Sequence, residues 1–220
     1  MVKVITVASL KGGVSKSTTA RHLSLALPQC ALIDLDPQGT TRRFIERREK
    51  RGRKAPIGIQ ANHDNLADAI ELAKTQGNCR YILIDTPPAH TDKRQLKSAV
   101  TLSDYILVPS KYSIDDLEIV PMVSQFVSEN GNAPMGYFLT MTRKVKAMNN
   151  ARAFLAKCAE KFGADVWDGE IKDRVAYVES AGLSQSVFEY NPKGEAAKEM
   201  QALCDWVLNN MKKSEVSNNG

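Results

Sequence analysis

The chain has 220 residues, of which 43% are hydrophobic and 25% charged, a composition that fits a folded globular protein and excludes a disordered one. No apolar run approaches the roughly 20 residues of a membrane-spanning helix, and the N-terminus lacks the apolar segment of a secretory signal. The net charge is +5, but residues 42–54 hold eight basic and two acidic side chains, so the excess is local. Such a run is typical either of a solvated helix face or of a surface that binds polyanions.

The four cysteines are far apart in the sequence and form no C-x-x-C pair. This spacing favours reduced, structural thiols over a disulfide framework or a metal cluster. We therefore expect a cytoplasmic protein.

Short apolar runs alternate with helical patterns along the chain. Strands are predicted over 3–9, 30–36, 81–88, 105–110 and 136–142, with weaker candidates at 57–59 and 165–167. Helices are predicted over 16–27, 41–52, 65–76, 93–102, 115–129, 148–162 and 194–212. Because the strands are nearly continuous in Val, Ile and Leu, they indicate parallel strands covered on both faces. The order predicts a three-layer α/β domain over residues 1–212, with a mostly parallel twisted sheet and a polar, flexible tail at 213–220.

The first predicted strand runs into the glycine-containing stretch VASLKGGVSKSTTARHL at residues 7–23. The strict phosphate-loop pattern, Gly-x-x-x-x-Gly-Lys-[Ser/Thr], would place glycine at positions 10 and 15, where this chain has Leu10 and Ser15. The loop can still turn its backbone N–H groups toward phosphate oxygens, and the next helix adds its N-terminal dipole. Lys16 would then reach the terminal phosphates and Ser17 would bind Mg²⁺.

Two further motifs carry carboxylates close to the carboxyl ends of predicted strands. The stretch LIDLDPQG at residues 32–39 provides Asp36, and YILIDTPP at 81–88 provides Asp85. Ligands of open α/β sheets bind at the carboxyl ends of the strands. Asp36 is therefore placed to orient water or to hold a metal through water, and Asp85 has the position of a Walker B aspartate that supports Mg²⁺.

The stretches KGGVSKST, DLDPQG and LIDTPP together resemble the ParA/MinD/Soj family of deviant Walker A ATPases, most of all its small, ParF-like plasmid-partition members. The resemblance implies a P-loop NTPase-like fold that binds ATP and Mg²⁺ in a homodimer. It implies that Lys11 reaches phosphates bound by the other subunit, whereas Lys16 serves its own nucleotide and Asp36 positions the hydrolytic water. Ser15 departs from the family's usual glycine, and we expect slow turnover if that position needs a positive φ.

By this reading the catalytic residues are Lys11, Lys16 and Asp36, and the metal ligands are Ser17, Asp36 and Asp85. The expected nucleotide-binding residues are Lys11, Gly12, Gly13, Val14, Ser15, Lys16, Ser17 and Thr18, with Thr142 and Arg143 near the adenine.

The resemblance implies a weak ATPase whose ATP-bound dimer binds nonspecific DNA. A centromere-binding adaptor of the ParB/ParG kind would stimulate hydrolysis and release the dimer from the nucleoid. The short chain, with no extension before Met1, favours plasmid cargo. Two basic groups compete for DNA. Composition favours the 42–54 run, with Arg47 and Arg51, whereas the resemblance favours a later group, because it implies DNA contacts toward the C-terminal part of the chain. The later group comprises Arg143, Lys144, Lys146, Arg152, Lys157 and Arg174.

Two alternatives remain open. One is a MinD-like positioning ATPase bound to membrane, although MKKSEVSNNG offers no bulky apolar anchor. The other is a metabolic enzyme on the same fold, which would leave Lys11 and DLDPQG unexplained.

Overall fold

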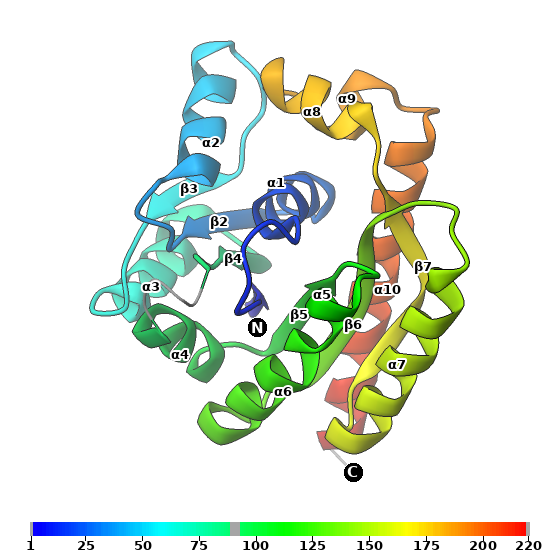
Figure 1. Ribbon diagram of the computed structural model, residues 1–220. Helices are drawn as coiled ribbons and strands as arrows, with labels where there is room; N and C mark the ends of the chain where they lie inside the picture. Colours follow the sequence, from blue (N-terminus) through cyan, green and yellow to red (C-terminus); the bar gives the residue numbers. More distant parts are fainter. Residues whose placement is uncertain (1, 89–92, 219–220) are drawn as a thin grey trace.

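Figure 1 shows the computed structural model, which describes residues 2–88 and 93–218. Its centre is a seven-stranded sheet in the order β3-β2-β4-β1-β5-β6-β7, in which every neighbouring pair is parallel. The strands are β1 Lys3–Val7, β2 Cys30–Asp34, β3 Ile57–Gln60, β4 Tyr81–Asp85, β5 Tyr105–Ser110, β6 Met135–Thr142 and β7 Asp165–Lys172. This confirms the predicted α/β class, and both weak strand candidates are real strands.

Helices cover both faces of the sheet because side chains alternate across each strand. Ile5 and Val7 of β1 belong to a core with helices α1, α2, α8, α9 and α10, whereas Val4 and Ala8 face cores with α3 to α7. The helices are α1 Lys16–Ala26, α2 Thr40–Lys50, α3 Leu66–Gly77, α4 Lys93–Thr101, α5 Ile114–Leu117, α6 Ile119–Asn130, α7 Ala147–Phe162, α8 Val175–Gly182, α9 Val187–Tyr190 and α10 Glu195–Asn218. The predicted three layers are therefore present (Figure 1).

Strand register brings the motifs together at one edge of the sheet. Asp85, the last residue of β4, pairs with Asp34 of β2 on one side and with Val7 of β1 on the other. The loops that follow β1, β2 and β4 thus start at one level of the sheet. Three sequence segments that are far apart in the chain form one site for this reason.

Several predicted boundaries are wrong. The single helix expected over 115–129 is two helices separated at Glu118, because Pro121 has no N–H and would clash with the carbonyl one turn earlier. Helices α8 and α9 were not predicted. The last helix continues to Asn218 instead of ending at 212, since residues 213–218 contain no glycine or proline. Over the described residues, no helix is long and apolar enough to cross a bilayer.

Candidate functional site

The loop between β1 and α1 opens toward the N-terminus of α1. Gly13 has a φ of +75°, and Ser15, the residue that precedes the helix, has a φ of +60°. The Ser15 side chain makes no capping hydrogen bond and the first turn contains no acidic residue, so its N–H groups are available to an anion. A serine in the left-handed region costs about 1 kcal/mol, so the departure at position 15 does carry backbone strain.

Lys16 lies inside this loop. Its side chain is buried, and its Nζ donates to the carbonyl oxygen of Lys11 at 3.1 Å. Burial lowers the pKa of Lys16, while the charges of Asp85 and Asp36 act in the opposite direction. A buried ammonium group with one carbonyl partner is a strong site for an incoming anion.

Lys11 points elsewhere. Its Nζ lies 2.7 Å from Oδ1 of Asp116, a residue of α5, and its side chain is 40% exposed. The hydrogen bond from Lys11 to Asp116 raises the pKa of the lysine. A third cation, Lys111, extends from the end of β5, with its Nζ 3.8 Å from where a Cβ would stand on Gly13.

Asp85 is a buried carboxylate with unused bonding capacity. Its Oδ2 accepts from the Thr41 hydroxyl at 2.5 Å, while its Oδ1 has no hydrogen-bond partner among the described residues. Burial, together with the Asp34 charge, raises the pKa of Asp85 to about 6, and the hydroxyls of Thr41 and Ser17 and the charge of Lys16 oppose that rise.

This donor set fits Mg²⁺. The ion prefers hard oxygen ligands and is held by one or two carboxylates together with substrate phosphates. The orphaned Asp85 oxygen and the Ser17 hydroxyl supply such ligands. Within the described parts of the chain, no group of three His, Cys, Asp or Glu side chains could hold a metal alone.

The two aspartates of the DLD motif have different roles. Asp34 is buried, and its Oδ2 accepts from the backbone N–H groups of Thr41 and Arg42 at 2.9 Å each, so it stabilises the start of α2. Asp36 is half-buried, and its Oδ1 accepts from the N–H of Gln38 in a local turn. Asp36 is therefore the carboxylate of this pair that remains accessible next to the phosphate loop.

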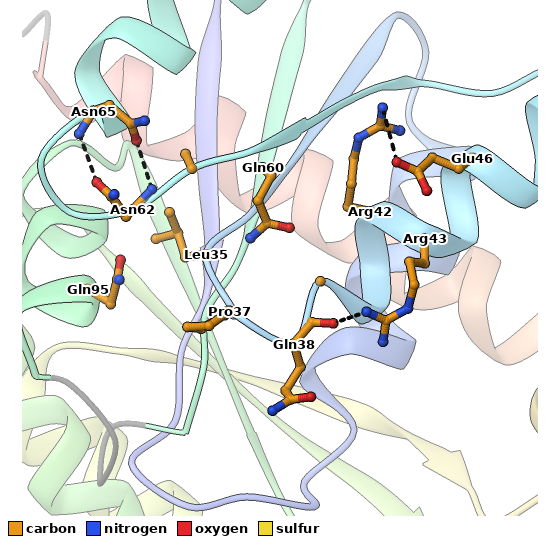
Figure 2. Close-up of a pocket in the computed structure, with 12 residues that line it drawn as sticks. Leu35, Pro37, Gln38, Arg42, Arg43, Glu46, Gln60, Asn62, Asn65 and Gln95 are labelled. Carbon is orange, nitrogen blue, oxygen red and sulfur yellow. Dashed lines mark hydrogen bonds and ion pairs between the residues drawn. The ribbon is translucent and has the colours of Figure 1, made fainter.

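A cavity of about 660 Å³ lies beside the loop of residues 35–39, and Figure 2 shows the side chains that line it. Gln60 of β3 donates its amide to the carbonyls of Asp34 and Asp36, at 2.8 and 2.9 Å. From the other side, Arg43 of α2 donates to the carbonyl of Gln38 (Figure 2). The loop that carries Asp36 is thus fixed by groups from two neighbouring elements.

The remaining predicted residues lie at the ends of β6 and β7. Thr142 is buried, and Arg143 pairs with Asp173 at 2.6 Å. Their expected position near an adenine remains a prediction. The later basic group is divided: its arginines form ion pairs, whereas its lysines are exposed. The exposed lysines are Lys144, Lys146 and Lys157.

Sequence reasoning assigned no role to Thr41, and it placed Lys111 and Asp116 only within the segment 108–118, which follows a strand end and is expected near the dimer interface or the nucleotide. Thr41 could have been found as a hydroxyl in the first turn of the helix that follows DLDPQG. Lys111 follows a predicted strand directly, at the same edge of the sheet as the three motifs. The contact between Asp116 and Lys11 had no sequence signal, because it depends on how α5 packs.

Comparison with known proteins places this site in a family. The model of the CobQ/CobB/MinD/ParA nucleotide binding domain matches residues 5–187. The chain is 26% identical to maintenance of carboxysome distribution protein A of Halothiobacillus neapolitanus, over 93% of this chain and 95% of that protein. It is also 26% identical to chromosome partitioning protein ParA of Caulobacter vibrioides, over 87% and 88% of the two chains.

Among solved structures, a putative plasmid partition protein from Borrelia burgdorferi B31 bound to AMPPNP superposes with a TM-score of 0.76 at 20% identity. The match covers 96% of this chain and all of that one. This structural match supports the fold. The family assignment depends on the family model, which covers most of the sequence. The chain therefore belongs to the CobQ/CobB/MinD/ParA nucleotide-binding family and is an ATPase of the ParA/MinD type.

Proposed function

We propose that the loop of residues 11–18 binds ATP with Mg²⁺. Lys16 would neutralise the terminal phosphates, and the N–H groups of Gly12, Gly13 and the first turn of α1 would cradle them. Ser17 and Asp85 would hold the ion, which supplies charge neutralisation when bound. Asp36 would orient the attacking water, since phosphoryl transfer depends mainly on positioning and electrostatics.

We infer further that the ATP-bound protein is a homodimer in which Lys11 completes its neighbour's site. The observation that carries this proposal is the divergence of the two lysines. Lys16 is buried in its own loop, whereas Lys11 is exposed, at 40%, and paired with Asp116 on α5. A lysine so placed is available to phosphates outside its own loop once it leaves Asp116.

Exposed apolar side chains support an interface at the same edge of the sheet. Ile114 follows β5, Val145 follows β6 and Val175 follows β7, and all three are exposed. Because all strands are parallel, these residues lie at the edge that carries the phosphate loop. Apolar groups gathered around a functional edge are typical of a protein–protein contact.

A site completed by a second subunit links nucleotide state to assembly. We propose that the ATP dimer binds DNA without sequence preference and that adaptor-stimulated, otherwise slow hydrolysis releases it, so that a cargo such as a plasmid is partitioned over the nucleoid. The relatives support a positioning role, since their names refer to carboxysome distribution and chromosome partitioning. The strained Ser15 supports slow turnover.

Binding of a labelled, mixed-sequence DNA duplex should be measured by fluorescence anisotropy with ADP, ATP and a non-hydrolysable ATP analogue. We expect binding with ATP and the analogue that weakens steeply as salt increases, and little binding with ADP. Equal affinity in all nucleotide states would contradict the proposal. Co-sedimentation with anionic liposomes in ATP, without DNA binding, would support a membrane-bound positioning ATPase instead.

A further inference from the structure

Helix α2 carries its charges in separate stripes. One stripe is buried against the core and consists of Thr41, Phe44, Ile45 and Arg48. A second stripe is mixed in sign, because Arg42 forms ion pairs with Glu46 at 3.5 Å and Glu49 at 4.0 Å. The third stripe is exposed and cationic, and it consists of Arg43, Arg47 and Lys50 together with Arg51, which directly follows the helix.

The spacing of the cationic stripe follows the helix repeat. Positions 43, 47, 50 and 51 are separated by four, three and one residues, which places them on one side of a helix over about 12 Å of its axis. Lys54 follows in the exposed segment after the helix. A solvated helix face usually mixes both signs of charge, and α2 already does so on its second stripe.

Among the described residues, these cations form no ion pair with an acidic side chain. Across residues 2–88 and 93–213, no carboxylate oxygen lies within 4.0 Å of a nitrogen of the four stripe side chains. The contacts that Arg43 and Arg51 do make are with backbone carbonyls, of Gln38 and Gly182. Their positive charge is therefore not neutralised by a direct ion pair, although Glu46 lies one helical turn from both Arg43 and Lys50.

The later basic group differs in this respect. Each of its three arginines is paired with a carboxylate: Arg143 with Asp173, Arg152 with Glu170 and Arg174 with Glu199. A carboxylate partner neutralises the charge of such an arginine and occupies part of its guanidinium group, so the arginine attracts a phosphate less strongly. The later group therefore offers its lysines, scattered between ion pairs, while α2 offers an unbroken row.

We propose that the cationic stripe of α2 is the surface that binds the phosphate backbone of DNA. This inference rests on the proposed function and specifies which face carries it. Guanidinium and ammonium groups that follow one helix face contact phosphates without reading base sequence.

The first turn of α2 also connects this stripe to the nucleotide site. Thr41 donates its hydroxyl to Asp85, and its N–H, with that of Arg42, donates to Asp34. A metal ion bound to Asp85 would share that carboxylate with the hydroxyl of Thr41. The stripe begins at Arg43, two residues after Thr41, so one helical turn joins the proposed DNA surface to the proposed metal site.

Two matched triple variants test the assignment. One replaces Arg47, Lys50 and Arg51 with glutamine, and the control replaces Lys144, Lys146 and Lys157 with glutamine. Both sets are exposed, so unchanged melting curves and nucleotide binding are expected for each. DNA binding is then measured with the non-hydrolysable analogue between about 50 and 200 mM salt.

The α2 variant should lose at least about tenfold in affinity, and its salt slope should fall by about 2 to 3, since each lost phosphate contact removes about 0.9. The control should remain within about threefold of the wild type. Wild-type affinity in the α2 variant, or the larger loss in the control, would overturn the assignment to α2 while leaving the proposed function intact. Absence of DNA binding by the wild-type protein would instead refute the proposed function itself.

Discussion

Replacing Asp85 with asparagine should stabilise the nucleotide-free protein and abolish its response to Mg²⁺. Asp85 is buried and has an oxygen without a partner, so its negative charge is costly in the folded chain. The pKa of this carboxyl is raised to about 6 from an ordinary value of 3.8. At pH 7 the side chain is ionised in both the folded and the unfolded state, and the folded state carries the penalty.

The size of that penalty follows from the pKa difference. A rise of about 2 pKa units corresponds to about 3 kcal/mol of lost stability at pH 7. Asparagine removes the charge but weakens the hydrogen bond from Thr41, at a cost of about 1 kcal/mol. We therefore expect a net gain of about 2 kcal/mol in the free energy of unfolding.

Urea denaturation at a series of pH values measures this gain. Because the folded pKa lies above the unfolded one, the Asp85 penalty is absent below about pH 4 and fully present above about pH 6. The difference between variant and wild type should therefore grow as pH rises through this window. Adding Mg²⁺ to the ATP-bound protein should then stabilise the wild type only. A variant that is less stable than the wild type at pH 7, or a difference that does not change with pH, would refute the reasoning.

Three further substitutions test single contacts. Ser15→Gly should raise the melting temperature by a few degrees, because glycine removes about 1 kcal/mol of left-handed strain, and an unchanged or lower melting temperature would contradict this. Asp116→Asn should lower the protein concentration at which the ATP form dimerises, because Lys11 no longer has to break an ion pair. Light scattering measures this concentration, and weaker dimerisation would contradict the proposed role of Lys11. Arg48→Ala should destabilise the fold by about 3 kcal/mol in urea, because it empties a buried site and leaves the carbonyl oxygens of Lys54 and Ser184 without their donor. The exposed Arg47→Ala control should change stability by less than about 0.5 kcal/mol.

The fold and the centre of the site could be predicted because both depend on local sequence patterns. Near-continuous apolar runs identify buried parallel strands, and parallel strands bring their carboxyl ends to one edge. This reasoning correctly placed Asp36 and Asp85 beside the loop that contains Lys16. The residues of the three motifs could be identified without knowing how the chain packs.

Other features depend on packing between distant segments and could not be predicted. Arg48 looks like one more cation of a basic run, yet it is fully buried because Glu189 reaches it from α9. Helix α8 was missed because Val175 and Val178 are exposed, so its apolar residues do not mark a buried face. The pairing of Lys11 with Asp116 depends on α5, whose break from α6 was not predicted.

Sedimentation velocity with Mg²⁺ and a non-hydrolysable ATP analogue tests most directly whether two copies share their nucleotides through Lys11. The wild-type protein should sediment as a dimer with the analogue and as a monomer with ADP. Lys11→Ala should remain monomeric while still binding the analogue, and Lys16→Ala should bind no nucleotide. A wild-type protein that binds the analogue as a monomer, or a Lys11→Ala variant that dimerises normally, would contradict the account.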